Sequence, residues 1–511
     1  MTSPNAVPAP GSKTSGSSRR RFIQETLGTL VATSVLAKLV DGEKLSAAEP
    51  APIRTEPLVS KAASLPYLIG VAEADITPTW PVKMAGFAFR GDKLSAGVYQ
   101  PLYTRAISID DGKNKIVYLM ADICFWDNRN RPEGIVEGIR AGLKNNHGLS
   151  PEQVVMVATH THSGPVLSDA KFKPLLIEKA IQVVGDALKS ARPARLFFGR
   201  GKTEIGIARR GRDVNGDGVW EINPYGSHDR EIVVLKAVDH AGRPIALTFN
   251  YGCHPTTMGT QMIGGDYAGF AQLEMKKRLG GAPALFLQGT AGDAKPNNPD
   301  PDNRFLFLSP TKATVDQPEA FGKQLADDVS RVLAAPMNEI TGPIRFGLVT
   351  TELPFLSAWK GNQMIETDAN ADPAKPLSGP RRRMARMARW TLDSMNENGE
   401  YHATQKSDIY VVRIGDAFIH VGISGEACSP IGLRLKDQLR GCEVMVTGYT
   451  GLMNGYIPGQ SQLSAGGYEV FTNPRRLPYS PEAEDMLVCD AVNLVQTIGP
   501  KIPSLETKPP P

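Results

Sequence analysis

Two of the eight histidines in this chain lie one residue apart, in the segment Thr159–Pro165. The apolar run Val154–Ala158 precedes them and predicts a buried strand. Because side chains two residues apart on a strand point to the same face, His160 and His162 are expected to project together from the end of this strand. Taken alone, such a pair more often ends a strand with two polar side chains than binds a metal. Other ligands must therefore be sought.

A second histidine motif follows the same plan. His254 comes after the apolar run Pro244–Tyr251 and leads into a Pro-Thr-Thr turn. Gly264–Gly269 then precedes a helical stretch, and Gly289–Asp293 follows another apolar run. Each segment is a predicted strand or strand end followed by a short polar turn, in which glycine permits a close backbone approach. The two histidine motifs therefore suggest one shared site.

The order of these motifs resembles that of the neutral ceramidases. The motifs are His160–Pro165, Cys253–Met258, Gly265–Ala271 and Gly292–Asn297, together with Gly70–Thr77 and Ser424–Cys428. The resemblance covers roughly residues 67 to 475. It implies an α/β fold of mixed β-sheets flanked by helices. It also implies a zinc amidase that cleaves the N-acyl bond of ceramide.

The resemblance assigns roles residue by residue. It implies one Zn²⁺ per chain, and two neutral imidazoles with one carboxylate form a catalytic zinc set that leaves a position for water. Zinc lowers the pKa of such a water and polarises the substrate carbonyl. The implied zinc ligands are His160, His254, Glu426 and Tyr456; the implied catalytic residues are His162 and Arg209; the implied substrate-binding residues are Asp293, Lys295 and Tyr468. The alternative interpretation of Arg209 is an ordinary surface arginine without a role at the site.

One residue departs from the family pattern. Where the family motif has serine, this chain has Lys295. A serine nucleophile at this position is excluded, and zinc-activated water gives the simplest mechanism. Two interpretations of Lys295 remain open: it meets an anionic group of the substrate, or it stays in solvent.

The function predicted is hydrolysis of an N-acyl amide, of ceramide or a related compound. The alternatives are a zinc hydrolase of another acyl amide or ester, and a non-catalytic ceramidase-like protein that binds lipid or glycan. The formal net charge is only +4, from 57 basic and 53 acidic residues, so no nucleic-acid partner is predicted. The expected partner is a small-molecule or lipid substrate.

Calcium and disulfide sites are not expected. Asp213–Gly218 begins like a calcium loop, but Pro224 stands at the twelfth position, where such a loop needs glutamate. A polar turn is predicted there. The five cysteines are widely spaced without a CxxC motif. A single bridge remains open, and we expect buried free thiols.

The first 48 residues predict an export signal. Arg19–Arg21 precedes a mildly apolar stretch, Leu27–Val40, which resembles a twin-arginine signal peptide and is too short to span a bilayer. A small-residue cleavage site ends at Ala48. We expect passage through the twin-arginine translocation machinery to the periplasm or the cell exterior, with no transmembrane segment in the mature protein.

The remaining chain is predicted to form a disordered tether at 49–66, a catalytic domain at 67–500 and a flexible tail at 501–511. Too few residues follow Val470 for the family's C-terminal immunoglobulin-like domain, so we expect none. Apolar runs alternate with amphipathic stretches, which is typical of α/β proteins. The expected strands are 67–71, 104–109, 116–121, 154–158, 195–198, 231–238, 244–251, 284–288, 342–353, 409–414, 417–423 and 443–447; the expected helices are 132–145, 174–191, 269–279, 318–334, 381–395 and 429–439.

Overall fold

The computed structural model describes residues 66–127, 134–214, 216–356, 404–471 and 478–502. These residues all belong to one compact unit that spans 52–511. The predicted signal peptide, most of the tether, the predicted helix 381–395 and most of the predicted tail lie outside the described residues.

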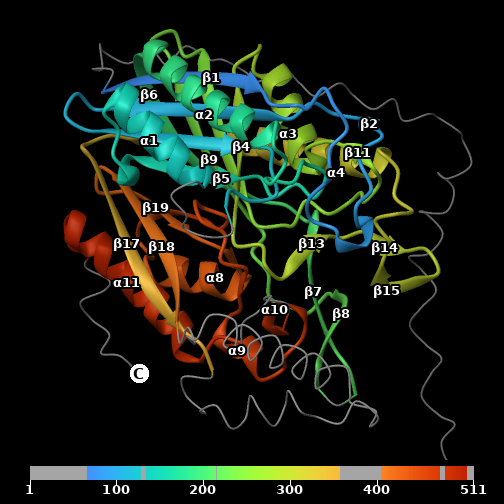
Figure 1. Ribbon diagram of the computed structural model, residues 1–511. Helices are drawn as coiled ribbons and strands as arrows, with labels where there is room; N and C mark the ends of the chain where they lie inside the picture. Colours follow the sequence, from blue (N-terminus) through green and yellow to red (C-terminus); the bar gives the residue numbers. More distant parts are fainter. Residues whose placement is uncertain (1–65, 128–133, 215, 357–403, 472–477, 503–511) are drawn as a thin grey trace, which may run out of the picture. The chain divides into compact units, whose positions relative to one another are not determined.

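The largest sheet in the described part of the chain has nine strands (Figure 1). Its order is β12-β10-β9-β6-β1-β3-β4-β5, and β16 pairs with β6. β4 runs parallel to β5 and β10 parallel to β12, whereas the other neighbours are antiparallel. The strands are β1 (Tyr67–Asp75), β3 (Tyr103–Asp110), β4 (Lys115–Ala121), β5 (Val154–Ala158), β6 (Arg192–Lys202), β9 (Glu231–Val238), β10 (Pro244–Tyr251), β12 (Ala284–Gln288) and β16 (Asn338–Ile340).

A second sheet of four strands, in the order β17-β18-β19-β21, lies below the first in Figure 1. β19 and β21 are parallel, and the other pairs are antiparallel. Its strands are β17 (Ile344–Pro354), β18 (Thr404–Ile414), β19 (Phe418–Ile423) and β21 (Glu443–Thr447). The long helices are α1 (Ile135–His147), α2 (Phe172–Lys189), α3 (Asp266–Arg278), α4 (Asp316–Ala334), α8 (Ser429–Gln438) and α11 (Glu482–Ile498).

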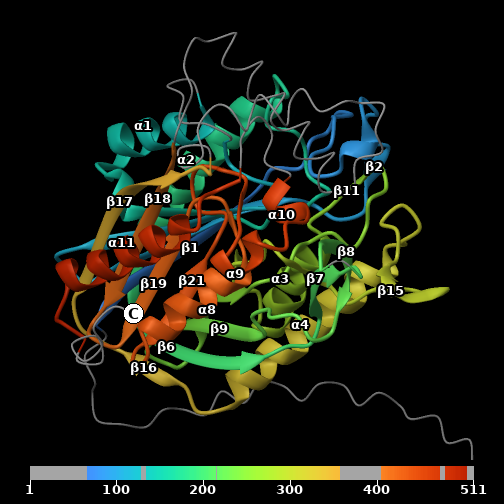
Figure 2. The same ribbon diagram turned by 90° about the horizontal axis from the view of Figure 1, so that it is seen from below.

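The alternation of side chains along the strands explains the layers. On β4, Tyr118 and its neighbours two residues away join the cluster between the two sheets, where they meet Val412 and Met445. Val117 and Leu119 face the other way and pack with α1 and α2. α3 and α4 pack with the residues of β9, β10 and β12 that point away from the second sheet. The outer face of the second sheet packs with α8 and α11, which lie in front of it in Figure 2. The layers are therefore helix, sheet, sheet and helix.

Short elements connect these layers near the site. The strands are β2 (Gly97–Val98), β7 (Gly206–Arg212), β8 (Gly218–Asn223), β11 (Met262–Ile263), β13 (Ala294–Pro296), β14 (Pro299–Asp300), β15 (Asn303–Phe307), β20 (Glu426–Ala427) and β22 (Tyr456–Ile457); the short helices are α9 (Gln460–Leu463) and α10 (Tyr468–Phe471). β13, β7 and β8 form a small antiparallel sheet. In the segment that begins like a calcium loop, between β7 and β8, the backbone NH of Asp213 donates to the carbonyl of Asp217 over 2.9 Å.

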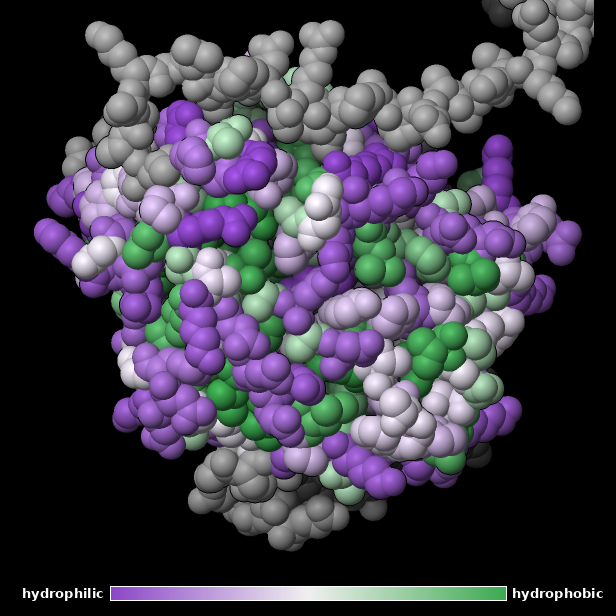
Figure 3. Space-filling view, turned by 90° about the horizontal axis from the view of Figure 1, so that it is seen from above, coloured by the Kyte–Doolittle hydropathy of each residue, from purple (hydrophilic) through white to green (hydrophobic). Residues whose placement is uncertain are grey.

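The predicted α/β fold of mixed sheets flanked by helices is confirmed. The predicted bounds of β5, β9, β10, β12 and β21 coincide with the observed ones. The β7–β8 hairpin and α11 were not predicted from the sequence. None of the described helices combines the length and the apolar character needed to cross a bilayer. The face seen in Figure 3 mixes hydrophilic and hydrophobic residues.

Candidate functional site

The candidate site lies where several strands of both sheets end. His160 follows the carboxyl end of β5, and His254 follows that of β10. Glu426 and Tyr449 follow the carboxyl ends of β19 and β21 in the second sheet. Parallel strands bring their carboxyl ends to one edge, where α/β proteins commonly bind ligands. The fold therefore gathers segments that are far apart in the sequence.

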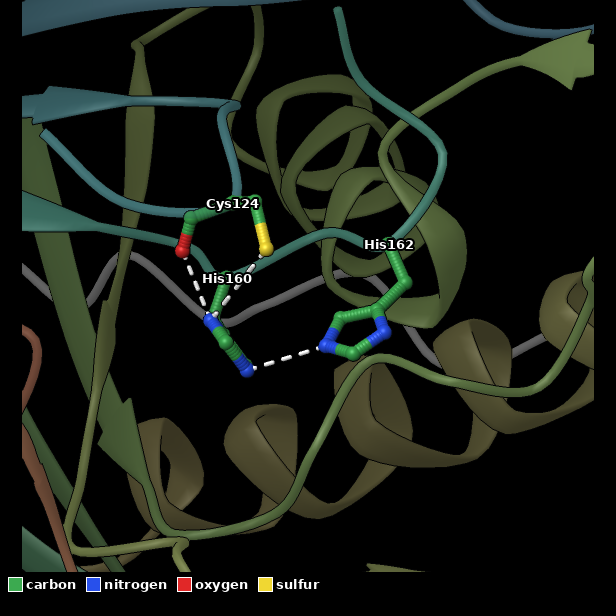
Figure 4. A group of neighbouring side chains, drawn as sticks. All are labelled: Cys124, His160 and His162. Carbon is green, nitrogen blue, oxygen red and sulfur yellow. Dashed lines mark hydrogen bonds between the residues drawn. The ribbon is translucent and has the colours of Figure 1, made fainter. Parts of the chain in front are cut away.

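His160 and His162 lie beyond the end of the strand, so the strand alternation expected to bring their rings together is wrong. β5 ends at Ala158, and His160 takes a left-handed backbone with φ of 65°. The two-residue alternation of a strand therefore stops before the pair. The turn nevertheless brings the rings together, with 3.0 Å between their Nε2 atoms, as Figure 4 shows. The Nδ1 of His160 lies 2.6 Å from the carbonyl oxygen of Cys124.

His162 is held from its other side by the segment that precedes β2. The ring edge of Phe87 contacts the ring of His162 at 4.9 Å between centroids. The guanidinium of Arg90, which is buried, donates to the backbone carbonyl of His162. Gly86 lies so close to the ring that a Cβ there would be 2.4 Å from Cγ of His162. The Nδ1 atom of His162 is buried without a hydrogen-bond partner among the described residues.

His254 is fully buried and fixed by backbone carbonyls. Its Nδ1 lies 2.6 Å from the carbonyl oxygen of Ala291 and 3.2 Å from that of Ala294. Its own backbone NH donates to Ala294 over 3.1 Å. These contacts turn Nε2 toward Glu426 and Tyr456, at 3.1 Å from the Glu426 carboxylate and 3.3 Å from the Tyr456 hydroxyl.

Glu426 and Tyr456 are neighbours across two short strands. β20 and β22 are parallel, and their register pairs these two residues directly. Gly292 allows β20 to approach, because a Cβ there would lie 2.7 Å from the carbonyl oxygen of Glu426. The carboxylate of Glu426 reaches Nε2 of His160 at 3.4 Å as well as that of His254.

These side chains suit a cation. The ligand atoms of His160, His254 and Glu426 all lie within 4.8 Å of one another. A neutral His254 uses its only N–H on the backbone carbonyls, so the lone pair of Nε2 faces a carboxylate. Two acceptors at 3.1 Å repel unless a cation lies between them. Atoms that share a tetrahedral zinc at ~2.0–2.1 Å lie about 3.3 Å apart, close to the separations seen here.

The electrostatics of the metal-free protein fit this description. Burial and the nearby Arg209 lower the pKa of His254 to about 3, so that its imidazole is neutral. Burial opposes ionisation of Glu426, but His160 and His254 outweigh it and hold the pKa of Glu426 well below its usual range. Burial alone would lower the pKa of His160, yet Cys124 and Glu426 raise it to about 10. The carboxylate is thus ionised, with a protonated His160 and a neutral His254 beside it. His160 must therefore release its proton when it binds a metal.

Arg209 is only 1% exposed, so its interpretation as an ordinary surface arginine is wrong. Its Nε donates to Glu469 over 2.9 Å, and its Nη2 donates to the Tyr456 hydroxyl over 3.1 Å. Its guanidinium also stacks over the ring of Trp220 at 4.2 Å. Arg209 therefore connects the β7–β8 hairpin to the tyrosine beside His254. Tyr468 lies alongside, with its ring 5.5 Å from that of Tyr456.

Asp293 is held by protein donors, and Lys295 fits only one of its two interpretations. Both carboxylate oxygens of Asp293 are bound by protein donors: the backbone and hydroxyl of Ser429 bind one, and the side-chain amide of Gln462 binds the other. Asp293 therefore fixes the start of α8 and does not offer a free carboxylate to substrate. Lys295 is only 5% exposed, so the solvent interpretation is wrong.

Sequence reasoning missed Cys124 and Tyr449. The thiol of Cys124 lies 3.8 Å from Nδ1 of His160, and the ring of Tyr449 lies 4.2 Å from that of His160. Tyr449 also donates to Glu426 over 3.4 Å. Both residues follow apolar strands, β4 and β21, in polar turns. That signal, the same as for His160 and His254, could have identified them. All five cysteines are free, and Cys442 and Cys489 are not buried.

Residues 67–304 match the family model of neutral/alkaline non-lysosomal ceramidases, N-terminal part. Neutral ceramidase A of Dictyostelium discoideum is 26% identical over 269 residues, which cover 47% of this chain and 37% of that protein. The neutral ceramidase of Pseudomonas aeruginosa is 28% identical over 266 residues, which cover 47% of this chain and 38% of that protein. The matched segment thus spans less than half the length of these relatives.

The fold is also that of a solved structure. The crystal structure of neutral ceramidase from Pseudomonas aeruginosa aligns with a TM-score of 0.65 at 20% identity, over 86% of this chain and 76% of that chain. A structure described as a ceramidase complexed with C2 aligns with a TM-score of 0.64, also at 20% identity, with the same coverage of both chains. At 20% identity, these alignments show that this chain shares the fold of the two solved structures.

Proposed function

We propose that this chain, whose residues 67–304 match the model of the neutral/alkaline non-lysosomal ceramidase family, is a zinc-dependent hydrolase of an N-acyl amide bond. One observation carries the proposal: His160, His254 and Glu426 converge within 4.8 Å, with Nδ1 of each histidine already bound by a backbone carbonyl. This donor set fits zinc. When bound, zinc would supply Lewis acidity for the carbonyl and a more acidic water.

His162 is proposed to move protons. Burial and the neighbouring His160 and His254 lower the pKa of His162 well below its usual value, so the ring is neutral. A neutral imidazole can take a proton from the attacking water and return it to the leaving amine. Addition of water across the amide C–N bond then gives a free carboxylate and a free amine.

Tyr456 is proposed to donate a hydrogen bond to the oxygen of the substrate carbonyl as negative charge develops on that oxygen. This role is an alternative to the role of Tyr456 as a zinc ligand. Burial and the charge of Glu426 raise its pKa well above the usual value, so it keeps its proton at neutral pH. The donation from Arg209 to the same hydroxyl orients it and increases its acidity as a donor.

Hydrolysis of a panel of N-acyl compounds tests this function. We expect the purified protein to release fatty acid from at least one N-acyl amide, to lose this activity after chelation and to regain it with Zn²⁺. His254→Ala should abolish the activity, while His240→Ala, which alters an exposed histidine, should not. Release that resists chelation, or release from acyl esters alone, would overturn the proposal. Binding of lipid without hydrolysis would favour a non-catalytic protein.

We also propose export through the twin-arginine pathway. The arginines at 19–21 and the short apolar stretch that follows support it. Replacing Arg19 and Arg20 together by lysine should leave the chain in the cytoplasm at its precursor length, whereas the unchanged chain should appear shortened outside it. Equal distribution of both chains would contradict the proposal.

A further inference from the structure

Lys295 is a buried cation for which the described residues supply no counter-ion. It lies on β13, paired with Ile207 of β7. Its ammonium lies 4.4 Å from the centre of the Phe307 ring and 6.0 Å from that of Trp220. No hydrogen bond or ion pair joins its side chain to another described residue. Aromatic faces attract a cation, but they replace only part of the hydration that an ammonium loses on burial.

The other buried basic residues of the described chain differ from Lys295 in this respect. Arg105 is bound by Glu73 and Asp122, and Arg209 by Glu469. Arg90 and Arg413 donate to backbone carbonyls. The fold supplies acceptors wherever it buries a guanidinium. Around Lys295 it supplies aromatic rings, and the described residues offer no acceptor for the N–H donors of the ammonium. Desolvation and the charge of Arg209 lower the pKa of Lys295 to about 8, which agrees with an ammonium that lacks an anion.

Lys295 adjoins the candidate metal site by two routes. Its chain neighbour, Ala294, provides the carbonyl that lies 3.2 Å from Nδ1 of His254. The ring of Trp220 also lies under the guanidinium of Arg209, which donates to the Tyr456 hydroxyl beside His254. The ammonium and the guanidinium of Arg209 therefore share the Trp220 ring, and Arg209 in turn reaches the proposed site through Tyr456. It occupies the position at which the family motif has serine.

We propose that Lys295 binds an anionic group of the substrate, so that the preferred substrate is an N-acyl amino acid, whose carboxylate lies beside the scissile amide, and not a neutral ceramide. This inference rests on the proposed amidase function. Hydrolysis of such a compound consumes one water and yields a fatty acid and an amino acid. A single carboxylate matches the single charge of Lys295. A dianionic phosphate would leave a negative charge near the buried Glu469 and Glu426.

Two substrates that share one acyl chain test the proposal. N-dodecanoylglycine carries the carboxylate, and N-dodecanoylethanolamine replaces it by a neutral alcohol. We expect the unchanged protein to hydrolyse the glycine compound with the higher kcat/KM. Lys295→Met should lower kcat/KM for this compound by about 10- to 100-fold, as expected for loss of a charge-assisted hydrogen bond. The ratio of kcat/KM for the glycine compound to kcat/KM for the ethanolamine compound should fall accordingly. Lys295→Arg should restore part of the preference, and Lys312→Met, at an exposed site, should have no effect.

Binding to the metal-free protein gives a second readout that does not depend on hydrolysis. Calorimetry should show tighter binding of N-dodecanoylglycine than of N-dodecanoylethanolamine, and Lys295→Met should remove the difference. Equal binding of both compounds, or a preference that survives Lys295→Met, would overturn the inference. If neutral amides are cleaved in a zinc-dependent manner without any such preference, the inference fails and the amidase function stands. If no amide is cleaved but the binding preference depends on Lys295, the amidase function fails and the anion site stands.

Discussion

At the scale of single residues, the candidate site depends on which nitrogen of each histidine is already bound. Backbone carbonyls bind Nδ1 of His160 and His254, so only Nε2 of each ring is left to face Glu426. A carbonyl or carboxylate on the outer nitrogen is the usual support of a metal-binding histidine, because it fixes the ring and its tautomer. The site is thus organised in advance of any ligand.

Lys295 has a consequence for stability. Its pKa is about 8 in the folded protein and close to the ordinary 10.5 when unfolded, so the unfolded chain binds more protons between these values. Burial of the charged ammonium therefore lowers the free energy of unfolding by its full amount below pH 8, and this loss disappears as the pH rises toward 10.5. We expect Lys295→Met to raise the free energy of unfolding on the order of 2–3 kcal/mol at pH 7.

Urea unfolding at pH 7 and at pH 10 measures this effect. The gain from Lys295→Met should shrink at the higher pH, because the unchanged protein then buries a neutral amine. The free energy of unfolding of Lys312→Met should stay within about 0.5 kcal/mol of that of the unchanged protein at both pH values. A less stable Lys295→Met protein at pH 7, or a gain that is the same at both pH values, would show that Lys295 has an acceptor in the folded state.

The sequence predicted the residues that meet at this site better than their conformation. The pattern of apolar runs ending in polar turns pointed to His160 and His254, because that pattern depends only on strand burial. It could not reveal that His160 adopts a positive φ, since the left-handed backbone results from tertiary contacts and not from the residue type. Nor could it show that Lys295 is buried, because its neighbour Phe307 comes from a hairpin later in the chain.

At the scale of elements, backbone strain is concentrated around the site. Among the described residues, the non-glycine positions with positive φ are His160, Asp266 and Tyr449. Two of them contact each other, and Asp266 accepts the backbone NH of Thr257 in the turn that follows His254. Such conformations cost about 1–3 kcal/mol each and persist where the surroundings enforce them. The turns after β5, β10 and β21 are therefore held by packing.

The segment before β2 provides a test of how His162 is positioned. Gly86 has φ of 92°, and a Cβ there would meet the ring of His162. We expect Gly86→Ala to lower kcat by roughly 100-fold, because it displaces the ring that moves protons. Zinc content should not change, since His162 is not among the proposed ligands.

Gly112→Ala is the matched control. Gly112 has a similar φ of 88°, but a Cβ there would meet nothing within 4 Å. Both substitutions add backbone strain of about 1–2 kcal/mol, and only the first reaches the site. Equal kcat values for the two variants would mean that the position of His162 does not matter to the reaction.

The regular elements were easier to predict from the sequence than the short ones. β9 and β10 are mostly apolar segments bounded by turn residues, and their ends were predicted to the residue. The β7–β8 hairpin was missed because β7 contains Arg209 and Arg210, and charged side chains are typical of exposed segments. Both arginines are instead bound by Glu469, far away in the sequence. Such pairing is decided by the tertiary fold.

At the scale of the whole molecule, the site joins the two sheets. His160 and His254 come from turns after strands of the nine-stranded sheet, while Glu426 lies on the short strand β20, which follows β19 of the other sheet. A metal held by all three would link the two layers across their interface. The apolar runs predicted where the strands lie in the sequence, but not which sheet contributes which ligand.

The zinc content of the purified protein tests the central claim most directly. Elemental mass spectrometry should find one zinc per chain in the unchanged protein and in His240→Ala. The protein with both His160→Ala and His254→Ala should keep its fold, as checked by circular dichroism, and contain no stoichiometric zinc. No zinc in the unchanged protein, or one zinc per chain in the folded double variant, would contradict the account.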